Sequence, residues 1–335
     1  MEVVGSMSPG SQVLFADALS MSYRERTALR DLSFSLRPGH VMGFLGPNGA
    51  GKTTSIRIMT TILRPTSGHF VIDGIGSEHP AKIRPRIGVL PETLGLPKQI
   101  TGIEYLAYFG RLYGRKGAEA RTHSLSLLEL VGLRDRASSL IRTYSHGMRR
   151  RLGIARALVN DPVVIFLDEP TLGLDPRGQQ ELLTLLRGIA EERGAGVILC
   201  SHSLSEVEDV CDDVVILNAG RVVATGTVAE VLARAREEGS HRDALRLRVS
   251  ASSAAETRQL LEPLPSVAGV SAGIVEGQLS VELAAPVDTS TSDAHRATNG
   301  ILEVLVRADI PVLSFEIEGG RLQDAFLQLT AGGQL

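Results

Sequence analysis

A glycine-rich segment that ends in lysine and threonine carries the clearest chemical signal in the sequence. It reads Gly46-Pro47-Asn48-Gly49-Ala50-Gly51-Lys52-Thr53 and matches the pattern G-x-x-x-x-G-K-[ST]. An apolar, strand-like run precedes it, and a helix is expected to begin at the lysine. Glycines let backbone N–H groups turn toward phosphate oxygens, and the helix N-terminus adds partial positive charge. We therefore predict a phosphate-binding loop, with Lys52 at the β- and γ-phosphates, the Thr53 hydroxyl on Mg²⁺ and Thr54 also in contact with the nucleotide.

A pair of carboxylates at the end of an apolar run is the second signal. Residues 163–167 are Val, Val, Ile, Phe and Leu, and Asp168 and Glu169 follow them. Two adjacent acids at the end of a buried strand are costly unless a metal or a ligand offsets their charge. We expect Asp168 to hold Mg²⁺ through the water shell of the ion, and Glu169 to take a proton from an attacking water. Together with the loop, this pair predicts binding of a nucleoside triphosphate.

Further motifs, in order along residues 14–235, resemble the ATP-binding subunit of ABC transporters. They are Tyr23 ahead of the loop, Thr143-Tyr144-Ser145-His146-Gly147-Met148-Arg149-Arg150-Arg151-Leu152 at the position of the family's Leu-Ser-Gly-Gly-Gln signature, Gly173-Leu174-Asp175 at the position of its D-loop, and His202 at the position of its switch histidine. The resemblance implies the α/β fold of a P-loop NTPase (ABC ATPase) with a helical subdomain. It also implies ATP and Mg²⁺ as cofactors, and ATP hydrolysis coupled to transport.

The resemblance assigns roles to these positions. In the family the aromatic residue, here Tyr23, stacks on adenine, and the histidine, here His202, hydrogen-bonds the γ-phosphate and orients the water and the base. Ser145 and Gly147 are expected to start a helix, with a hydroxyl and a bare N–H facing an anion. In the family this segment caps the γ-phosphate held by the other subunit, and the resemblance places Asp175, at the D-loop position, among the nucleotide-binding residues. The implied active unit is a head-to-tail homodimer, or a heterodimer with a similar subunit.

The sequence departs from the commonest family pattern at two places. Tyr144, His146 and Met148 replace Leu, Gly and Gln in the signature. The His146 ring either adds a pH-sensitive charge near the phosphate or faces the surface, and we favour the surface. Glu92 stands where the family usually has a glutamine that touches Mg²⁺ or the lytic water. Glutamate keeps an oxygen but brings a negative charge and no N–H donor; we keep Glu92 among the site residues.

An aromatic stripe lies between Glu92 and the signature. Thr101 and Glu104 predict a capping box, which marks a helix start. The stripe has helical spacing and consists of Tyr105, Tyr108, Phe109 and Tyr113. In the family this region receives a short helix of the membrane subunit. An ordinary packed helix face explains most of these side chains equally well.

The hydrophobic pattern divides the chain into parts. Short apolar runs alternate with helical stretches over the first two thirds, which predicts strands buried on both faces of a mostly parallel sheet. The strand-like runs are 41–45, 163–167, 197–200 and 214–217. We assign residues 1–10 to a flexible tail and 11–238 to the ABC ATP-binding domain, with the helical subdomain at about 95–155.

A different pattern begins after residue 240. Strict alternation of apolar and polar residues at 245–249, 279–283 and 313–317 predicts strands with one buried face. With helices near 253–261 and 294–308, the order is β-α-β-β-α-β, and a last helix is expected at 322–329. We predict a small α+β ferredoxin-like accessory domain at 243–332. It resembles the extra domain of some exporter-type ABC subunits, and by analogy of fold it is regulatory or dimer-stabilising.

Composition narrows the class of partner. The chain has 335 residues, a formal charge of −3 and two cysteines, and it lacks an apolar run long enough to span a bilayer. We expect an exporter subunit at the cytoplasmic face of the membrane, bound to a separate integral membrane permease, with no nucleic-acid partner. The alternative is a soluble non-transport ABC ATPase that acts on the ribosome or on DNA. A single cassette, a short interval between Lys52 and Asp168, and the absence of basic excess disfavour that alternative.

Overall fold

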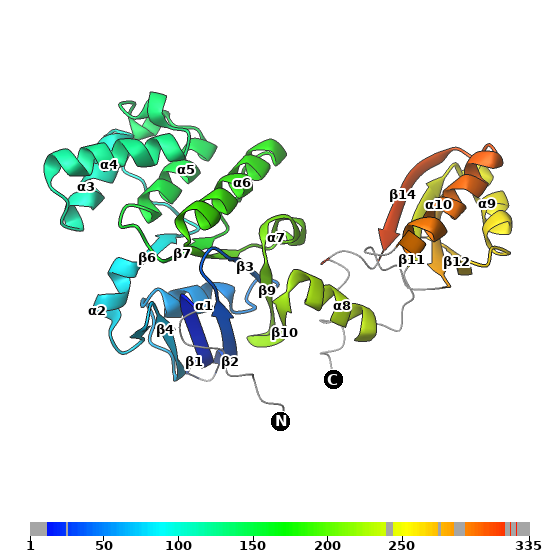
Figure 1. Cartoon of the computed structure of the whole chain (residues 1–335), viewed down its shortest axis with the longest axis horizontal. Coiled ribbons are helices and arrows are strands. Elements are labelled where there is room, and N and C mark those ends of the chain that lie inside the picture. The colour runs from blue at the N-terminus through cyan, green and yellow to red at the C-terminus, as the bar shows by residue number, and fades with distance from the viewer. Residues whose placement is uncertain are drawn as a thin grey trace. The chain divides into compact units, whose positions relative to one another are not determined.

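The chain forms two compact units, which are described separately. The computed structural model describes residues 12–24, 26–238, 244–273, 276–284 and 292–318, together with Leu322 and Phe326. The first unit is Met1–Val228 and the second is Ala229–Leu335 (Figure 1). The helix α8 (Val228–Glu238) begins where the first unit ends.

The first unit is built on one ten-stranded sheet. Its strands are β1 (Leu14–Tyr23), β2 (Arg26–Leu36), β3 (Val41–Leu45), β4 (Ser67–Ile72), β5 (Ile75–Gly76), β6 (Ile87–Leu90), β7 (Val164–Asp168), β8 (Gly196–Cys200), β9 (Asp213–Asn218) and β10 (Arg221–Thr227). Their order in the sheet is β5-β4-β1-β2-β10-β9-β3-β8-β7-β6. Strands β6, β7, β8, β3 and β9 are mutually parallel, whereas β1, β2, β4 and β5 pair antiparallel. The expected parallel sheet is therefore confirmed for one half, and the antiparallel half was not predicted.

Helices cover this sheet on both faces. They are α1 (Lys52–Met59), α2 (Pro80–Ile83), α3 (Gly102–Leu112), α4 (Gly117–Leu130), α5 (His146–Ala157), α6 (Pro176–Arg193) and α7 (Leu204–Val210). Figure 1 shows α3, α4 and α5 gathered beyond the end of the sheet that carries β6. This group is the helical part expected from the sequence.

Alternate residues of the central strands supply two separate cores. Along β7, Ile165 and Leu167 pack in a core shared with α5 and α6, whereas Val164 and Phe166 pack in a core shared with α1, β1 and β2. All five residues of β7 are buried, and the same is true of β3 and β8. Successive side chains of a strand point to opposite faces, so a strand buried on both faces is expected to be apolar, and Asp168 at the end of β7 departs from this pattern.

The start of α3 confirms the predicted capping box. The Thr101 hydroxyl accepts a hydrogen bond from the Glu104 backbone N–H, and the Glu104 carboxylate accepts one from the Thr101 N–H at 2.8 Å. The Thr101 N–H and the Thr101 hydroxyl both donate hydrogen bonds to the Glu104 carboxylate, and these two bonds hold the pKa of Glu104 below its usual value. The helix that carries the aromatic stripe therefore begins at a defined residue.

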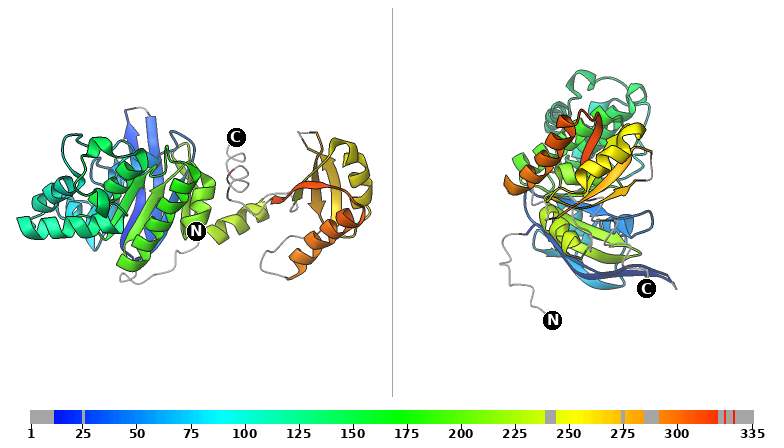
Figure 2. Two further views of the ribbon diagram at one scale, coloured as in Figure 1. Left: turned by 90° about the horizontal axis from the view of Figure 1, so that it is seen from above. Right: turned by 90° about the vertical axis from the view of Figure 1, so that its right-hand side faces the viewer.

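The second unit has the predicted order of elements. Its strands are β11 (Ala244–Val249), β12 (Val267–Ala272), β13 (Gln278–Leu283) and β14 (Val312–Glu318), and its helices are α9 (Ala254–Leu261) and α10 (Ser292–Arg307). The antiparallel sheet has the order β12-β13-β11-β14, which is ferredoxin-like. Both helices lie on one face of it (Figure 2), where Leu261, Ile301 and Leu305 join a core with Leu247 and Val281.

The predicted last helix falls almost wholly outside the described residues. It was expected at 322–329, where the structure describes only Leu322 and Phe326. In the part of the chain that the structure describes, none of the helices is both long and apolar enough to cross a membrane.

Candidate active site

The phosphate-binding loop connects β3 to α1, as the sequence predicts. Gly46 has φ 150°, and a Cβ atom there would lie 2.3 Å from the Leu217 carbonyl oxygen. Gly51 has φ 111°, and a Cβ atom there would lie 2.9 Å from the Ala28 carbonyl oxygen. Residues with a side chain rarely adopt such angles and would collide with backbone here. The sequence of the loop is thus dictated by its close approach to neighbouring strands.

Lys52 folds back over this loop. Its side-chain Nζ donates hydrogen bonds to the Gly46 carbonyl at 2.6 Å and to the Pro47 carbonyl at 3.4 Å. The residue is only 7% exposed. The first turn of α1 contains no acidic side chain, so the positive end of the helix is not neutralised locally. Ammonium and helix N-terminus together suit a phosphate chain.

Asp168 ends β7 inside a cluster of acids. Burial raises its pKa, and the nearby carboxylates of Glu92 and Glu169 raise it further, whereas a hydrogen bond from the Thr53 hydroxyl and the charge of Lys52 lower it. The raised pKa of Asp168 reflects excess negative charge in a confined space. A bound cation would offset this charge.

The acid pair continues into a strained residue. Glu169 has φ 50°, in the left-handed region that residues other than glycine rarely occupy. Its backbone N–H donates to the Cys200 carbonyl at 3.0 Å, which ties the end of β7 to the end of β8. Such strain persists where the surroundings fix the backbone, and it is typical of functional sites. Here it aims the Glu169 carboxylate at His202.

Glu169 and His202 are hydrogen-bonded to each other. His202 Nδ1 lies 2.7 Å from Glu169 Oε2, and the two side chains are 61% and 14% exposed. Both residues follow the carboxyl ends of parallel strands, where ligands of open α/β sheets bind. The pair is suited to accept a proton from water and to orient it.

These groups meet in one cavity of about 860 Å³. It is lined by Tyr23, Arg26, Thr27, Ala28, Pro47, Asn48, Gly49, Ala50, Gly51, Lys52, Thr53, Thr54, Glu92, Asp168, Glu169, Leu172, His202 and Ala219. Gly46 is not part of the lining; its carbonyl instead accepts the hydrogen bond from Lys52. The cavity falls in the size range of small-molecule sites. It brings together most of the residues that the sequence predicts.

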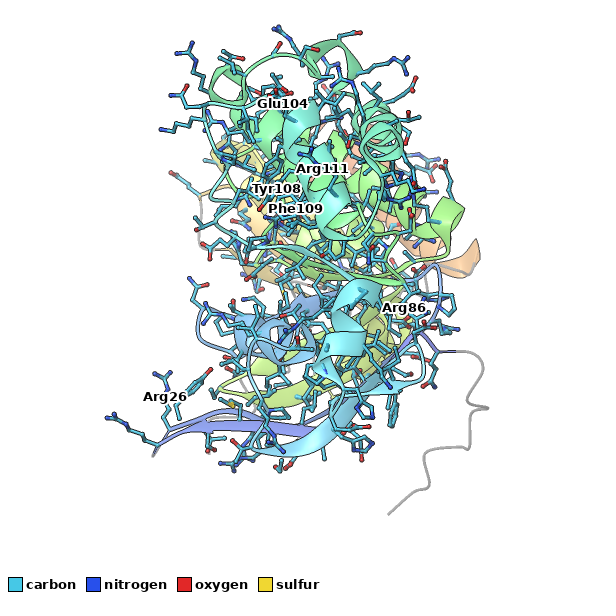
Figure 3. All side chains as sticks on the ribbon, turned by 90° about the vertical axis from the view of Figure 1, so that its left-hand side faces the viewer. Arg26, Arg86, Glu104, Tyr108, Phe109 and Arg111 are labelled. Carbon is cyan, nitrogen blue, oxygen red and sulfur yellow. The ribbon has the colours of Figure 1, made fainter. Side chains whose placement is uncertain are left out.

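Five residues of this lining were not predicted from the sequence. They are Arg26, Thr27, Ala28, Leu172 and Ala219. Arg26 pairs with Tyr23 across the β1–β2 hairpin, and Figure 3 shows it at the end of that ribbon. A basic residue three positions after the predicted adenine-stacking aromatic is a signal that could have indicated it. No comparable pattern marks Leu172 or Ala219.

The remaining predicted residues lie in a different hollow. Ser145, Gly147 and Asp175 line a space of about 680 Å³ between the start of α5 and the start of α6. Ser145 is the N-cap of α5 and accepts a hydrogen bond from the Met148 N–H at 3.2 Å. Its hydroxyl proton can still be donated to an anion. The structure therefore does not bring these three residues into the cavity of the phosphate-binding loop of the same chain.

The replaced signature residue His146 is exposed and has a partner. Its Nε2 lies 2.9 Å from the Leu172 carbonyl, which requires the proton on Nε2. The ring also packs over Gly173, where a Cβ atom would lie 3.1 Å from Nε2. The favoured surface position is observed, and the ring joins α5 to the segment that follows Glu169.

The residues in the cavity fit the expected Mg²⁺. Magnesium is usually held by one or two carboxylates together with substrate phosphates, and it keeps several waters. The Thr53 hydroxyl and the Asp168 carboxylate both line the cavity, beside the loop that would hold the phosphates. Among the described residues no group of three or more His, Cys, Asp or Glu side chains could hold a metal alone. This donor set suits an ion that arrives with a nucleotide.

Comparisons with known proteins agree with this geometry. The profile of the family "ABC transporter" matches residues 29–172. The linearmycin resistance ATP-binding protein of Bacillus subtilis is 33% identical over 320 residues, which are 95% of this chain and 98% of that protein. The daunorubicin resistance ATP-binding protein DrrA3 of Streptomyces coeruleorubidus is 36% identical over 315 residues, 94% of each chain.

A solved structure extends the comparison to the fold. A dimeric ATP-binding cassette in a post-hydrolysis state, bound to ADP and Pi, matches with a TM-score of 0.59 and 25% identity. The match covers 64% of this chain and 98% of that one. The chain therefore belongs to the ABC transporter family, as an ATP-binding subunit that hydrolyses ATP.

Proposed function

We propose that this subunit drives an exporter by binding Mg-ATP between two copies arranged head to tail. The observation that carries the proposal is the division of the predicted nucleotide contacts between two hollows of one chain. The first hollow holds the phosphate-binding loop, Asp168, Glu169 and His202, and the second holds Ser145, Gly147 and Asp175. A second copy, turned head to tail, supplies the missing half of each site.

In this proposal each side chain has one task. Lys52 and the loop N–H groups bind the phosphates, and Tyr23 stacks on the base. Thr53 and Asp168 hold Mg²⁺, which neutralises charge on the β- and γ-phosphates. Glu169 takes the proton of the attacking water, and His202, 2.7 Å from it, fixes the carboxylate and contacts the γ-phosphate. Glu92 lines the same cavity and completes the polar wall around the water.

The partner in this proposal is a multispan membrane permease. The two relatives of nearly full length are named for resistance to linearmycin and daunorubicin, which supports export as the direction of transport. The site of action is then the cytoplasmic face of the membrane. The cargo is selected by the permease.

An exposed part of α3 is the proposed contact for that permease. The Tyr105 side chain is only 5% exposed, whereas Tyr108 and Tyr113 are 51% and 45% exposed. Phe109 packs edge-to-face between Tyr105 and Tyr108, with ring centroids 5.1 and 5.5 Å away. Figure 3 looks onto this face, where Tyr108 and Phe109 lie together. The stripe thus serves the core on one side and offers two tyrosine rings to a partner on the other.

Affinity purification of the Glu169→Gln variant with ATP tests the proposal. The variant is expected to hold ATP without turnover and to keep the closed dimer on its permease. A stoichiometric multispan membrane protein in the eluate is the expected result. Ribosomal or DNA-bound proteins, with none from the membrane, would instead favour the soluble ATPase. The Lys52→Ala variant, which should bind ATP weakly, is the matched control.

A further inference from the structure

A buried arginine behind the cavity has no task in the proposed mechanism. Arg150 lies on α5 and is only 3% exposed. Its Nη1 donates a hydrogen bond of 2.9 Å to the backbone carbonyl of Glu92, across 58 positions of sequence. Its buried Nε has no hydrogen-bond partner among the described residues. One hydrogen bond does not offset the free-energy cost of burying a guanidinium, so negative charges nearby must also stabilise it.

The compensating charges are the carboxylates of the nucleotide cavity. Burial lowers the pKa of Arg150, and this is opposed by Glu92 first, then by Glu169 and Asp168. Other groups act on the same carboxylates: the charge of Lys52 lowers the pKa of Asp168, and His202 is hydrogen-bonded to Glu169. Three carboxylates are thus faced by two fixed cations, Lys52 from the loop and Arg150 from α5.

Glu92 stands between these groups. It lines the nucleotide cavity, and it also lines a neighbouring space of about 590 Å³ whose wall includes Arg150. A neutral residue at position 92 would leave two carboxylates for the two cations. The glutamate adds a third negative charge close to where the phosphates are expected.

We propose that Arg150 is a positioning residue of the nucleotide site, which holds the Glu92 loop from behind and offsets the negative charge of the Glu92 carboxylate. This inference rests on the proposed function, because it assumes that the cavity receives ATP. The proposal predicts that the effect of a substitution at position 150 on nucleotide binding depends on the charge at position 92. An arginine that only filled space or only capped the Glu92 carbonyl would act independently of the charge at position 92.

A double-mutant cycle between Arg150→Gln and Glu92→Gln measures this coupling. Glutamine at position 150 keeps an N–H donor for the Glu92 carbonyl but removes the charge. The readout is equilibrium binding of a fluorescent ATP analogue with Mg²⁺ chelated, so that no metal masks the carboxylates. A second readout is the separate change in kcat and KM for Mg-ATP.

Arg150→Gln is expected to weaken metal-free binding about tenfold, because the Glu92 charge then repels the phosphates without compensation. Glu92→Gln alone should tighten binding, and the double variant should return to within about threefold of the parent. Arg150→Lys, which keeps the charge, should bind nearly as the parent does. Arg121→Met removes an exposed cation from α4, outside the linings of both spaces, and should change binding little.

Two results would overturn the inference. One is an equal loss from Arg150→Gln in the parent and in the Glu92→Gln background, and the other is no loss in either. If the Arg150→Gln variant does not fold, thermal unfolding of the double variant tests the inference instead. Recovery of folding by Glu92→Gln would support the coupling between the two positions. Continued failure to fold would contradict it. Failure of the parent protein to bind ATP would contradict the proposed function. The coupling between positions 150 and 92 is therefore measured only after binding of ATP by the parent has been shown.

Discussion

In the proposed mechanism, hydrolysis depends on the hydrogen-bonded pair of Glu169 and His202, of which Glu169 has a strained backbone. Glu169 occupies the left-handed region, and its N–H is held by the Cys200 carbonyl, two residues before His202. The ends of β7 and β8 therefore position Glu169, the proposed base, and His202, the proposed switch histidine, beside each other. A change at either residue acts on the same 2.7 Å contact.

Replacing Glu169 by Gln should separate binding from hydrolysis. The amide keeps the shape of the side chain but cannot accept the proton, so we expect kcat to fall by about 10²–10⁴-fold with ATP affinity retained. Steady-state phosphate release and equilibrium ATP binding measure the two quantities. Hydrolysis at the parental rate would show that another residue is the base.

Replacing Lys52 by Ala should instead weaken the binding of ATP itself. The Nζ atom bends over the loop at 2.6 Å from the Gly46 carbonyl, where it faces the expected phosphates. We expect ATP affinity to fall by about tenfold or more, because a charge-assisted contact to phosphate is lost. Titration calorimetry with ATP checks this, and unchanged affinity would remove Lys52 from the site.

At the residue scale, the residues that could be predicted from the sequence and that line one cavity belong to continuous segments. The loop glycines, Lys52 and the acid pair form continuous segments in which each type of residue has a physical reason. Arg150 gave no signal, because its partner Glu92 is 58 positions away and the side chain looks like any basic residue of a helix. The contact of His146 with the Leu172 carbonyl, 26 positions away, is hidden for the same reason.

At the scale of elements, α3 is predicted to transmit motion to the permease. Arginine at both Tyr108 and Tyr113 should disrupt an aromatic contact without disturbing the core, since both rings are about half exposed. We expect ATP binding and folding to be retained while the permease no longer stimulates hydrolysis. ATPase assays of the reconstituted complex measure this. Ile62→Arg, at a 68% exposed position outside α3, is the control.

Loss of nucleotide binding in the Tyr108 and Tyr113 variant would contradict this assignment. So would a normal response to the permease. In the first case the rings would be structural, and in the second the permease would bind elsewhere.

A second prediction for the elements concerns Asp212, which directly precedes β9 and binds residues of β3 and α6. Its Oδ2 accepts hydrogen bonds from the Val41 N–H at 2.9 Å and from Arg187 at 2.6 Å. Burial raises its pKa, but these bonds and the charge of Arg187 outweigh burial and lower it overall. A lowered pKa in the folded state stabilises the fold above the ordinary value of 3.8, and this stability is lost as the pH falls through the lowered pKa.

Asp212→Asn should therefore destabilise the protein in a pH-dependent way. We expect a loss of about 1–3 kcal/mol in the free energy of unfolding at pH 7. The difference should shrink as the pH is lowered below the ordinary pKa of aspartate. Urea unfolding over this range measures it. A difference that does not vary with pH would mean that the charge of Asp212 is irrelevant.

The central strands could be predicted, but the antiparallel half of the sheet could not. Runs such as 163–167 are apolar throughout, because β7 is buried on both faces. In β1 the pairing with β2 shifts register three times, which breaks the simple alternation of buried and exposed residues. The pattern of β11 and β13, by contrast, is regular, and the ferredoxin-like order followed from it.

At the scale of the whole molecule, the chain combines a nucleotide-binding unit and a small α+β unit. The order of strands in the second unit is confirmed, but its role stays a prediction, since fold alone does not define function. The larger unit carries, in separate hollows, the two sets of residues that we propose as the halves of a nucleotide site. We propose that two copies of the chain complete each other's nucleotide sites.

Mixing two inactive variants tests this claim most directly. Lys52→Ala damages the phosphate-binding loop, and Ser145→Arg damages the signature hollow. In a head-to-tail dimer each mixed pair contains one site with an intact loop and an intact signature. We predict that a 1:1 mixture hydrolyses ATP, up to about a quarter of the parental rate, while each variant alone is inactive. A mixture as inactive as its components, with mixed dimers demonstrated, would contradict the shared site.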